Sequence, residues 1–100
     1  MVYHGVRLPE EEIAKLCQRH HIRRLALFGS ILSDEFRPDS DIDVLVEFEP
    51  GKTPGLDFFG IEIELSDLLG RPVDLNTPRS LSRYFRDQVL AEARTLYAQA

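Results

Sequence analysis

Apolar residues near the start of the chain recur first at helical and then at strand-like spacing. Residues 8–12, LPEEE, place a proline in a possible first turn and acidic side chains where the positive end of a helix dipole would lie. Apolar positions then follow a helical period as far as His20. The pattern predicts a helix that ends near His20 and His21. The short apolar run from Ile22 to Phe28, IRRLALF, predicts a first strand.

The next part of the chain predicts a turn, a second strand and a loop. Gly29 and Ser30 interrupt the apolar run, and Ser30 is a suitable cap for a short helical turn as far as Phe36. After the turn at residues 37–40, RPDS, the segment from Asp41 to Phe48 is continuously apolar apart from its acidic positions, which predicts a buried second strand. Residues 49–55, EPGKTPG, are rich in proline and glycine and predict a loop.

The remaining pattern is less uniform. The segment from Leu56 to Leu69 fits both strand-like alternation and helical spacing, but its length and the stop at Gly70 favour a helix. Residues 72–76, PVDLN, predict a third strand. A final helix, capped by Thr77 or Ser80, is expected to run as far as Tyr97. Its expected core face consists of Leu81, Phe85, Leu90, Ala93 and Leu96.

This order of elements predicts an α/β fold around a small sheet. A length of 100 residues predicts one domain spanning residues 1–100, and a hydrophobic fraction of 43% is that of an ordinary globular protein. No apolar run reaches the roughly 18–20 residues that a membrane span needs, and MVYHGVRLPEEE has no secretory h-region. The lone Cys17 fits a reducing cytoplasm, and we expect it to be a buried, inert thiol. The net charge of −5 argues against direct nucleic-acid binding.

The carboxylates at the start of the second strand are the first candidates for chemistry. Residues two apart in a strand point to one face, so Asp41 and Asp43 should project together about 7 Å apart. Two such charges repel by roughly 2 kcal/mol at an effective dielectric constant near 20. Asp74 is the carboxylate of the third strand and would join them if the two strands are neighbours. Such a cluster suits two Mg²⁺ ions, or Mn²⁺, in nucleotidyl transfer.

The junction at Gly29 and Ser30 makes that interpretation more specific. It follows a strand and opens a helical turn, an arrangement that presents backbone N–H groups to an anion. Ten residues separate this junction from the Asp41-Ile42-Asp43 motif on the next strand. A phosphate-binding turn is therefore expected beside a metal-binding pair.

Together, FGS and DSDIDVLVEF resemble the signature of the DNA polymerase β-like nucleotidyltransferase superfamily. The short chain and the LGRPVDL segment resemble the minimal nucleotidyltransferases, the MntA-like antitoxins encoded beside HEPN-domain toxins. The resemblance implies a small mixed β-sheet flanked by helices. It also implies that Gly29 and Ser30 hold the ATP triphosphate, that Asp41 and Asp43 bind both metals, and that Asp74 is the third catalytic carboxylate and metal ligand.

Members of that subfamily transfer AMP from ATP to a tyrosine of a HEPN ribonuclease, so the resemblance implies a HEPN toxin as partner and a complex with it. Many relatives carry an arginine one or three residues after the serine, whereas this chain has Ile31 and Ser33. We expect weaker phosphate binding unless Arg37 replaces that contact. The arginines of the expected final helix form a basic stripe that is either a solvated face or a docking surface for the partner. They are Arg79, Arg83, Arg86 and Arg94.

Two alternatives remain open at this stage. One is nucleotidyl transfer to a small molecule, which a chain of 100 residues leaves little room to bind. The other is a binding module that blocks a toxin stoichiometrically and carries a vestigial site. A full set of three carboxylates argues against the vestigial site, because a chain without metal-dependent activity gains nothing from their mutual repulsion.

Overall fold

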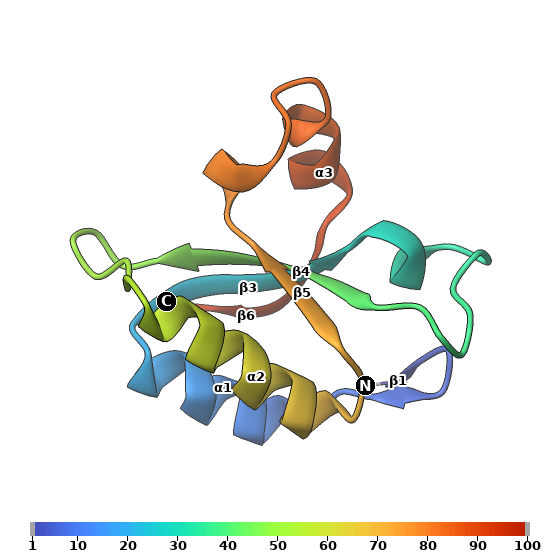
Figure 1. Cartoon of the computed structure of the whole chain (residues 1–100), viewed down its shortest axis with the longest axis horizontal. Coiled ribbons are helices and arrows are strands. Elements are labelled where there is room, and N and C mark those ends of the chain that lie inside the picture. Colours follow the sequence, from blue (N-terminus) through green and yellow to red (C-terminus); the bar gives the residue numbers. More distant parts are fainter. Residues whose placement is uncertain (1, 100) are drawn as a thin grey trace.

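The computed structural model describes residues 2–99 and contains a four-stranded mixed sheet in the order β5-β4-β3-β6 (Figure 1). Strand β3 (Ile22–Phe28) lies inside the sheet and pairs antiparallel with β4 (Ile42–Phe48) on one side and with β6 (Arg94–Ala98) on the other. Strand β5 (Val73–Asn76) pairs parallel with β4 at one edge. The predicted small mixed sheet is therefore confirmed.

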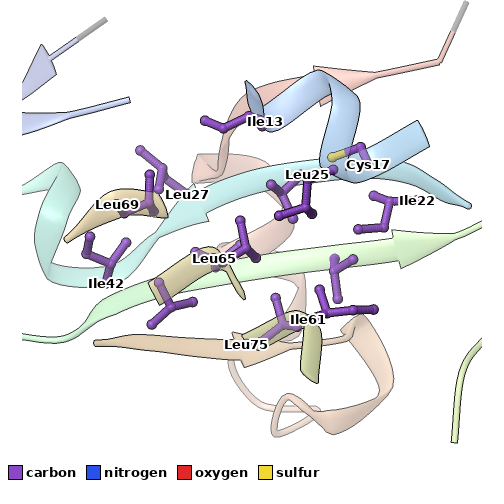
Figure 2. Close-up of a cluster of buried hydrophobic side chains, with 14 of the residues drawn as sticks. Ile13, Cys17, Ile22, Leu25, Leu27, Ile42, Ile61, Leu65, Leu69 and Leu75 are labelled. Atoms are coloured by element: carbon purple, nitrogen blue, oxygen red, sulfur yellow. The ribbon is translucent and has the colours of Figure 1, made fainter. Parts of the chain in front are cut away.

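Two helices cover one face of the sheet. Helices α1 (Glu10–Arg19) and α2 (Asp57–Leu69) lie next to each other below the strands in Figure 1. Figure 2 shows their apolar side chains meeting those of the strands. The buried side chains labelled there are Ile13, Cys17, Ile22, Leu25, Leu27, Ile42, Ile61, Leu65, Leu69 and Leu75. The other face of the sheet carries Asp43 together with the buried Leu45 and Ala26.

Shorter elements follow the ends of β3 and β5. The 3₁₀ turn η1 (Gly29–Leu32) follows β3 directly, and the 3₁₀ turn η2 (Pro78–Ser80) follows β5 after one residue. Helix α3 (Arg86–Glu92) then lies above the sheet, on the side away from α1 and α2 (Figure 1). This arrangement brings the chain from β5 back over the sheet before it enters β6.

The long final helix predicted from the sequence is wrong. Thr77 does cap a turn, with its hydroxyl accepting from the Ser80 amide, but that turn is η2 and not the start of a helix reaching Tyr97. Regular helix is confined to α3, and the expected core residue Phe85 is 61% exposed. Residues 94–98 instead form the edge strand β6, because pairing with β3 supplies a ladder of hydrogen bonds that outweighs weak helix propensity.

Several other predictions hold at the level of elements. The first strand has the predicted bounds, and α1, α2, β4 and β5 lie where their patterns placed them. The predicted turn from Ser30 to Phe36 is shorter, since η1 runs from Gly29 to Leu32, and no side chain caps its start. The sequence pattern did not predict the amino-terminal hairpin of β1 (Val2–Tyr3) and β2 (Val6–Arg7).

Within residues 2–99, no helix has the length and apolar composition needed to cross a membrane. The expected domain limits, 1 and 100, lie outside the described residues, so the prediction of a single domain stays a prediction.

Candidate active site

Two of the predicted carboxylates are directly opposite each other in the sheet. Asp43 of β4 and Asp74 of β5 are register partners in a parallel pair of strands, whose backbones lie about 5 Å apart. Their neighbours Ile42, Val44 and Val73 are buried in the core beneath the sheet. Because side chains alternate along a strand, the two carboxylates belong to the face opposite α1 and α2.

Asp41 completes the acidic group from just outside the strand. Asp41 is exposed and lies one residue before β4. Its position is therefore not fixed by strand pairing, unlike that of Asp43. The pKa of Asp43 is raised above its ordinary value, first by burial and then by the charges of Asp74 and Asp41. Asp43 is therefore close enough to both Asp74 and Asp41 to feel their charges.

Gly29 lies against Asp43. Phe28, the residue before it, is the register partner of Asp43 across β3 and β4. Gly29 has a φ of +78°, in the left-handed region that favours glycine. A Cβ atom at this position would lie 3.1 Å from Cγ and 3.3 Å from Cβ of Asp43, and still closer to the carboxylate oxygen Oδ2. The backbone at the end of β3 thus approaches the carboxylate in a way that only glycine permits.

Ser30 follows in η1 with a half-buried side chain. Within residues 2–99 its hydroxyl has no hydrogen-bond partner, while its carbonyl accepts from both the amide (2.9 Å) and the hydroxyl (3.0 Å) of Ser33. The hydrogen bonds that hold the turn therefore use the carbonyl of Ser30, and its hydroxyl remains available to a ligand. The role of Gly29 and Ser30 as a phosphate-binding turn stays a prediction.

Helix α2 fixes the strand that carries Asp74. The Val73 amide donates to Oγ of Ser66 (3.0 Å), and the Leu75 amide donates to Oε2 of Glu62 (2.8 Å). Both amides flank Asp74 on the outer edge of the sheet. Helix side chains thus replace the missing neighbour strand and hold the backbone of Asp74 in place.

Arg71 holds the turn before Asp41, and sequence reasoning did not single it out. Its guanidinium donates to the carbonyl oxygens of Arg37 (2.8 Å) and Ser40 (2.6 Å), and it lies 4.6 Å from the centroid of the Phe36 ring. The signal was present in LGRPVDL, where an arginine precedes the strand of Asp74. Arg71 therefore links the entry of β5 to the residue next to Asp41.

The metal-binding role of the carboxylates is tested here by their arrangement. In the part of the chain that the structure describes, no three histidine, cysteine or acidic side chains converge closely enough to hold one metal ion. The donor set nevertheless suits Mg²⁺, since it consists of carboxylates whose charges raise the pKa of Asp43. The chemistry of the side chains therefore fits the ion, and their coordination of it is a proposal taken up below.

Two cavities adjoin Gly29. One, of about 340 Å³, is mainly apolar and lies under α3, with a lining that includes Phe28, Phe85 and Val89. The other, of about 310 Å³, is polar and includes Ser33 and Arg94. A larger cavity of about 460 Å³ between α1 and α2 contains none of the predicted site residues. The space beside the site therefore lies on the α3 side of the sheet.

The remaining candidate residues have structural roles, or lie on separate elements of the fold. Burial raises the pKa of the Cys17 thiol to about 12, which confirms an inert thiol. His20 lies 3.0 Å from Glu64 at the end of α1. The predicted basic stripe does not exist as a helix face, because Arg86 alone lies in α3 and its guanidinium donates to the carbonyls of Pro78 (2.7 Å) and Leu81 (3.1 Å).

Residues 11–100 match the family model described as polymerase beta, nucleotidyltransferase. The chain belongs to this nucleotidyltransferase family. It is 39% identical over 79 residues to the protein adenylyltransferase MntA of Thermococcus cleftensis, a match that covers 78% of each chain. The family resemblance drawn from the two motifs and the prediction of a nucleotidyltransferase are both confirmed.

Solved structures of toxin–antitoxin proteins share the fold. A crystal structure of a toxin–antitoxin with AMP-PNP superposes with a TM-score of 0.72 at 26% identity, covering 92% of this chain and 75% of the other. A structure of tri-AMPylated HEPN toxin in complex with MNT antitoxin, from Shewanella oneidensis, gives a TM-score of 0.64 at 26% identity and covers 90% and 70% of the two chains. The chain is thus an MntA-like nucleotidyltransferase.

Proposed function

We propose that this protein transfers AMP from ATP to a tyrosine of a partner HEPN ribonuclease and so acts as its antitoxin. The observation that carries the proposal is the register pairing of Asp43 with Asp74 beside the close approach of Gly29. This places two carboxylates next to a turn suited to phosphate. The family match and the AMPylated toxin bound by a similar antitoxin supply the acceptor class.

In the proposed reaction, the tyrosine oxygen attacks the α-phosphorus of ATP. A new phosphorus–oxygen bond forms to tyrosine, the bond between the α-phosphorus and the bridging oxygen breaks, and pyrophosphate leaves. The backbone amides of η1 and the hydroxyl of Ser30 bind the phosphates. Asp74 accepts or orients the tyrosine proton, as expected of a general base near the acceptor.

The three carboxylates would hold the metal ions. Asp41, Asp43 and Asp74 supply hard oxygen ligands, and two divalent ions between them would neutralise the phosphate charge during transfer. The pKa of Asp43 is raised first by burial and then by the charges of Asp74 and Asp41, and a nearby cation would favour its charged form. Labelled ATP transfer should therefore require Mg²⁺ or Mn²⁺, and transfer that persists in EDTA would refute the metal role.

A titration separates this enzyme from a stoichiometric blocker. The protein is added, with ATP and Mg²⁺, to a fixed amount of a partner HEPN ribonuclease, and residual ribonuclease activity is measured. An enzyme needs only transient contact, so we expect inactivation far below a one-to-one ratio. The toxin should gain the mass of AMP and stay inactive after the two proteins are separated.

The matched control is the double variant Asp41→Asn/Asp43→Asn, which keeps the surface but lacks the metal-binding charges. We expect it to leave the toxin active and unmodified. Full protection by this variant at one-to-one, with no mass added to the toxin, would show that the chain is a blocker and not an enzyme.

A further inference from the structure

The polar cavity beside Gly29 brings an arginine to the site from an unexpected part of the chain. Its volume is about 310 Å³, and its lining consists of Gly29, Leu32, Ser33, Glu92 and Arg94. The turn from residue 29 to residue 36, GSILSDEF, contains no basic residue of its own. Arg94 is therefore the basic side chain that this cavity places next to the turn.

Strand β6 puts Arg94 on the side of β3 that lies away from the carboxylates. Arg94 is the register partner of Leu27, two residues before Gly29, and Asp43 is the partner of Phe28 on the other side. Two strand spacings of about 5 Å separate the backbones of β4 and β6. As the partner of the core residue Leu27, Arg94 leaves the strand on the α1/α2 face, whereas Asp43 lies on the other face of the sheet. The link between Arg94 and the turn is therefore the cavity at the end of β3, which Arg94 lines together with Gly29 and Ser33. Phosphates that extend past Gly29 could reach the guanidinium there.

Arg94 is also uncommitted. Its side chain is exposed, and across residues 2–99 the guanidinium has no hydrogen-bond or ion-pair partner. By contrast, Arg71 and Arg86 donate to backbone carbonyls and hold turns in place. Arg37, the sequence-based candidate for a phosphate contact, lines a different cavity with His4 and Phe36.

We infer that Arg94 binds the terminal phosphates of ATP and supplies the basic contact that Ile31 and Ser33 do not. The inference deepens the proposed function and rests on it, because it takes η1 to be the phosphate-binding turn. Guanidinium is well suited to this role, since its N–H groups form paired hydrogen bonds with phosphate oxygens. Glu92 lines the same cavity, and its negative charge would repel the phosphates and weaken ATP binding.

The test measures nucleotide binding by calorimetry in Mg²⁺ without any partner protein. Arg94→Ala should weaken ATP binding roughly tenfold to a hundredfold, as expected for loss of a charge-assisted hydrogen bond. AMP, which lacks the terminal phosphates, should bind equally well before and after the change. Arg94→Lys should fall between the two, and Glu92→Gln should tighten ATP binding.

The matched control is Arg7→Ala, which removes an exposed arginine from β2 and should leave ATP affinity unchanged. A rescue variant adds a second line of evidence. Because Ser33 lines the same cavity, Ser33→Arg should restore ATP affinity in the Arg94→Ala protein while adding little to the unchanged protein.

Equal ATP affinity in Arg94→Ala and the unchanged protein would overturn the inference. So would an equal loss of ATP and AMP affinity together with a lower thermal midpoint, because that pattern indicates that the substitution disturbs β6. Asp43→Asn in the same assay tests the ATP site separately from the role of Arg94. If Asp43→Asn lowers Mg²⁺-dependent ATP binding while Arg94→Ala does not, the proposed ATP site is supported and the role of Arg94 is refuted.

Discussion

Gly29 packs against the carboxylate of Asp43 so closely that no larger residue fits without moving that side chain. The contact joins the end of β3 to the start of β4, the two strands that position η1 and the acidic group. Glycine therefore has two functions here: it adopts the left-handed φ of +78° and it leaves room for Asp43.

Gly29→Ala tests this contact. We predict a stability loss of about 1–2 kcal/mol from the left-handed backbone, together with loss of AMP transfer because the new methyl group displaces Asp43. Urea unfolding and a labelled-ATP assay measure the two effects. Gly51→Ala is the matched control, because Gly51 has a similar φ of +76° and a methyl group added there would meet no atom within 4 Å. It should lose comparable stability and keep its activity; equal activity losses in both variants would refute the role of the contact.

Asp43→Asn should stabilise the metal-free protein while abolishing transfer. Burial, Asp74 and Asp41 raise the pKa of Asp43 in the folded state, so folding favours its protonated form. Stability from this group is fully present below the ordinary aspartate pKa and is lost as pH rises through the raised folded value. The substitution should therefore raise the thermal midpoint in EDTA at neutral pH, with a smaller gain near pH 3. A lower midpoint at neutral pH would contradict the repulsion.

Asp74→Asn should act on chemistry more than on ATP binding. Asp74 lies on the edge strand β5, and Asp43 on β4 lies between it and the end of β3. Asp74 is the carboxylate proposed to face the acceptor. We expect turnover to fall roughly 10²-fold or more, the usual effect of losing a positioned general base, with a much smaller change in ATP affinity. Single-turnover kinetics and calorimetry separate the two quantities. Matching losses in both would assign Asp74 to nucleotide binding instead.

Arg71→Ala should weaken metal binding although Arg71 is not itself a proposed metal ligand. Its guanidinium fixes the carbonyl of Ser40, the residue before Asp41, and truncation frees that turn. We predict that the Mg²⁺ concentration needed for half-maximal ATP binding rises about tenfold, the usual effect of losing an outer-shell partner. Arg71→Lys should recover part of the loss. An unchanged Mg²⁺ requirement would mean that Asp41 is held by other contacts.

The positions of the carboxylates and of the turn after β3 could be predicted from the sequence because their signals are local. Gly29 interrupts an apolar strand, and Asp43 alternates with buried residues whose burial fixes the register of β4. Pairing of β4 with β5, which brings Asp74 to Asp43, needed only the assumption that the two strands are neighbours. The support from Glu62, Ser66 and Arg71 could not be predicted, because it depends on how α2 and the turns pack in three dimensions.

Strand β6 was missed because its stability comes from distant partners. Residues 94–98 show no strong local preference, and the apolar spacing from Leu81 to Leu96 imitates a helix. The decisive interactions are pairing with β3 and the hydrogen bond from Arg24 to Thr95 (3.1 Å). The amino-terminal hairpin had one sequence signal, Gly5 at the second position of a two-residue turn. His4 and Gly5 adopt φ values of +49° and +80° there, between the paired residues Tyr3 and Val6.

The pairing of β3 with β6 also constrains the order in which the site is assembled during translation. β3 spans residues 22–28 and its neighbour β6 spans residues 94–98, so roughly seventy residues must be added between them. At about 5–20 residues per second, the ribosome takes roughly 4–14 s to do so. Gly29 and Asp43 leave the ribosome early, whereas Arg94 follows Asp43 by about fifty residues. A nascent chain therefore exposes an unpaired edge of β3 during this interval, and the cavity that Gly29 and Arg94 line together can form only after β6 has been made.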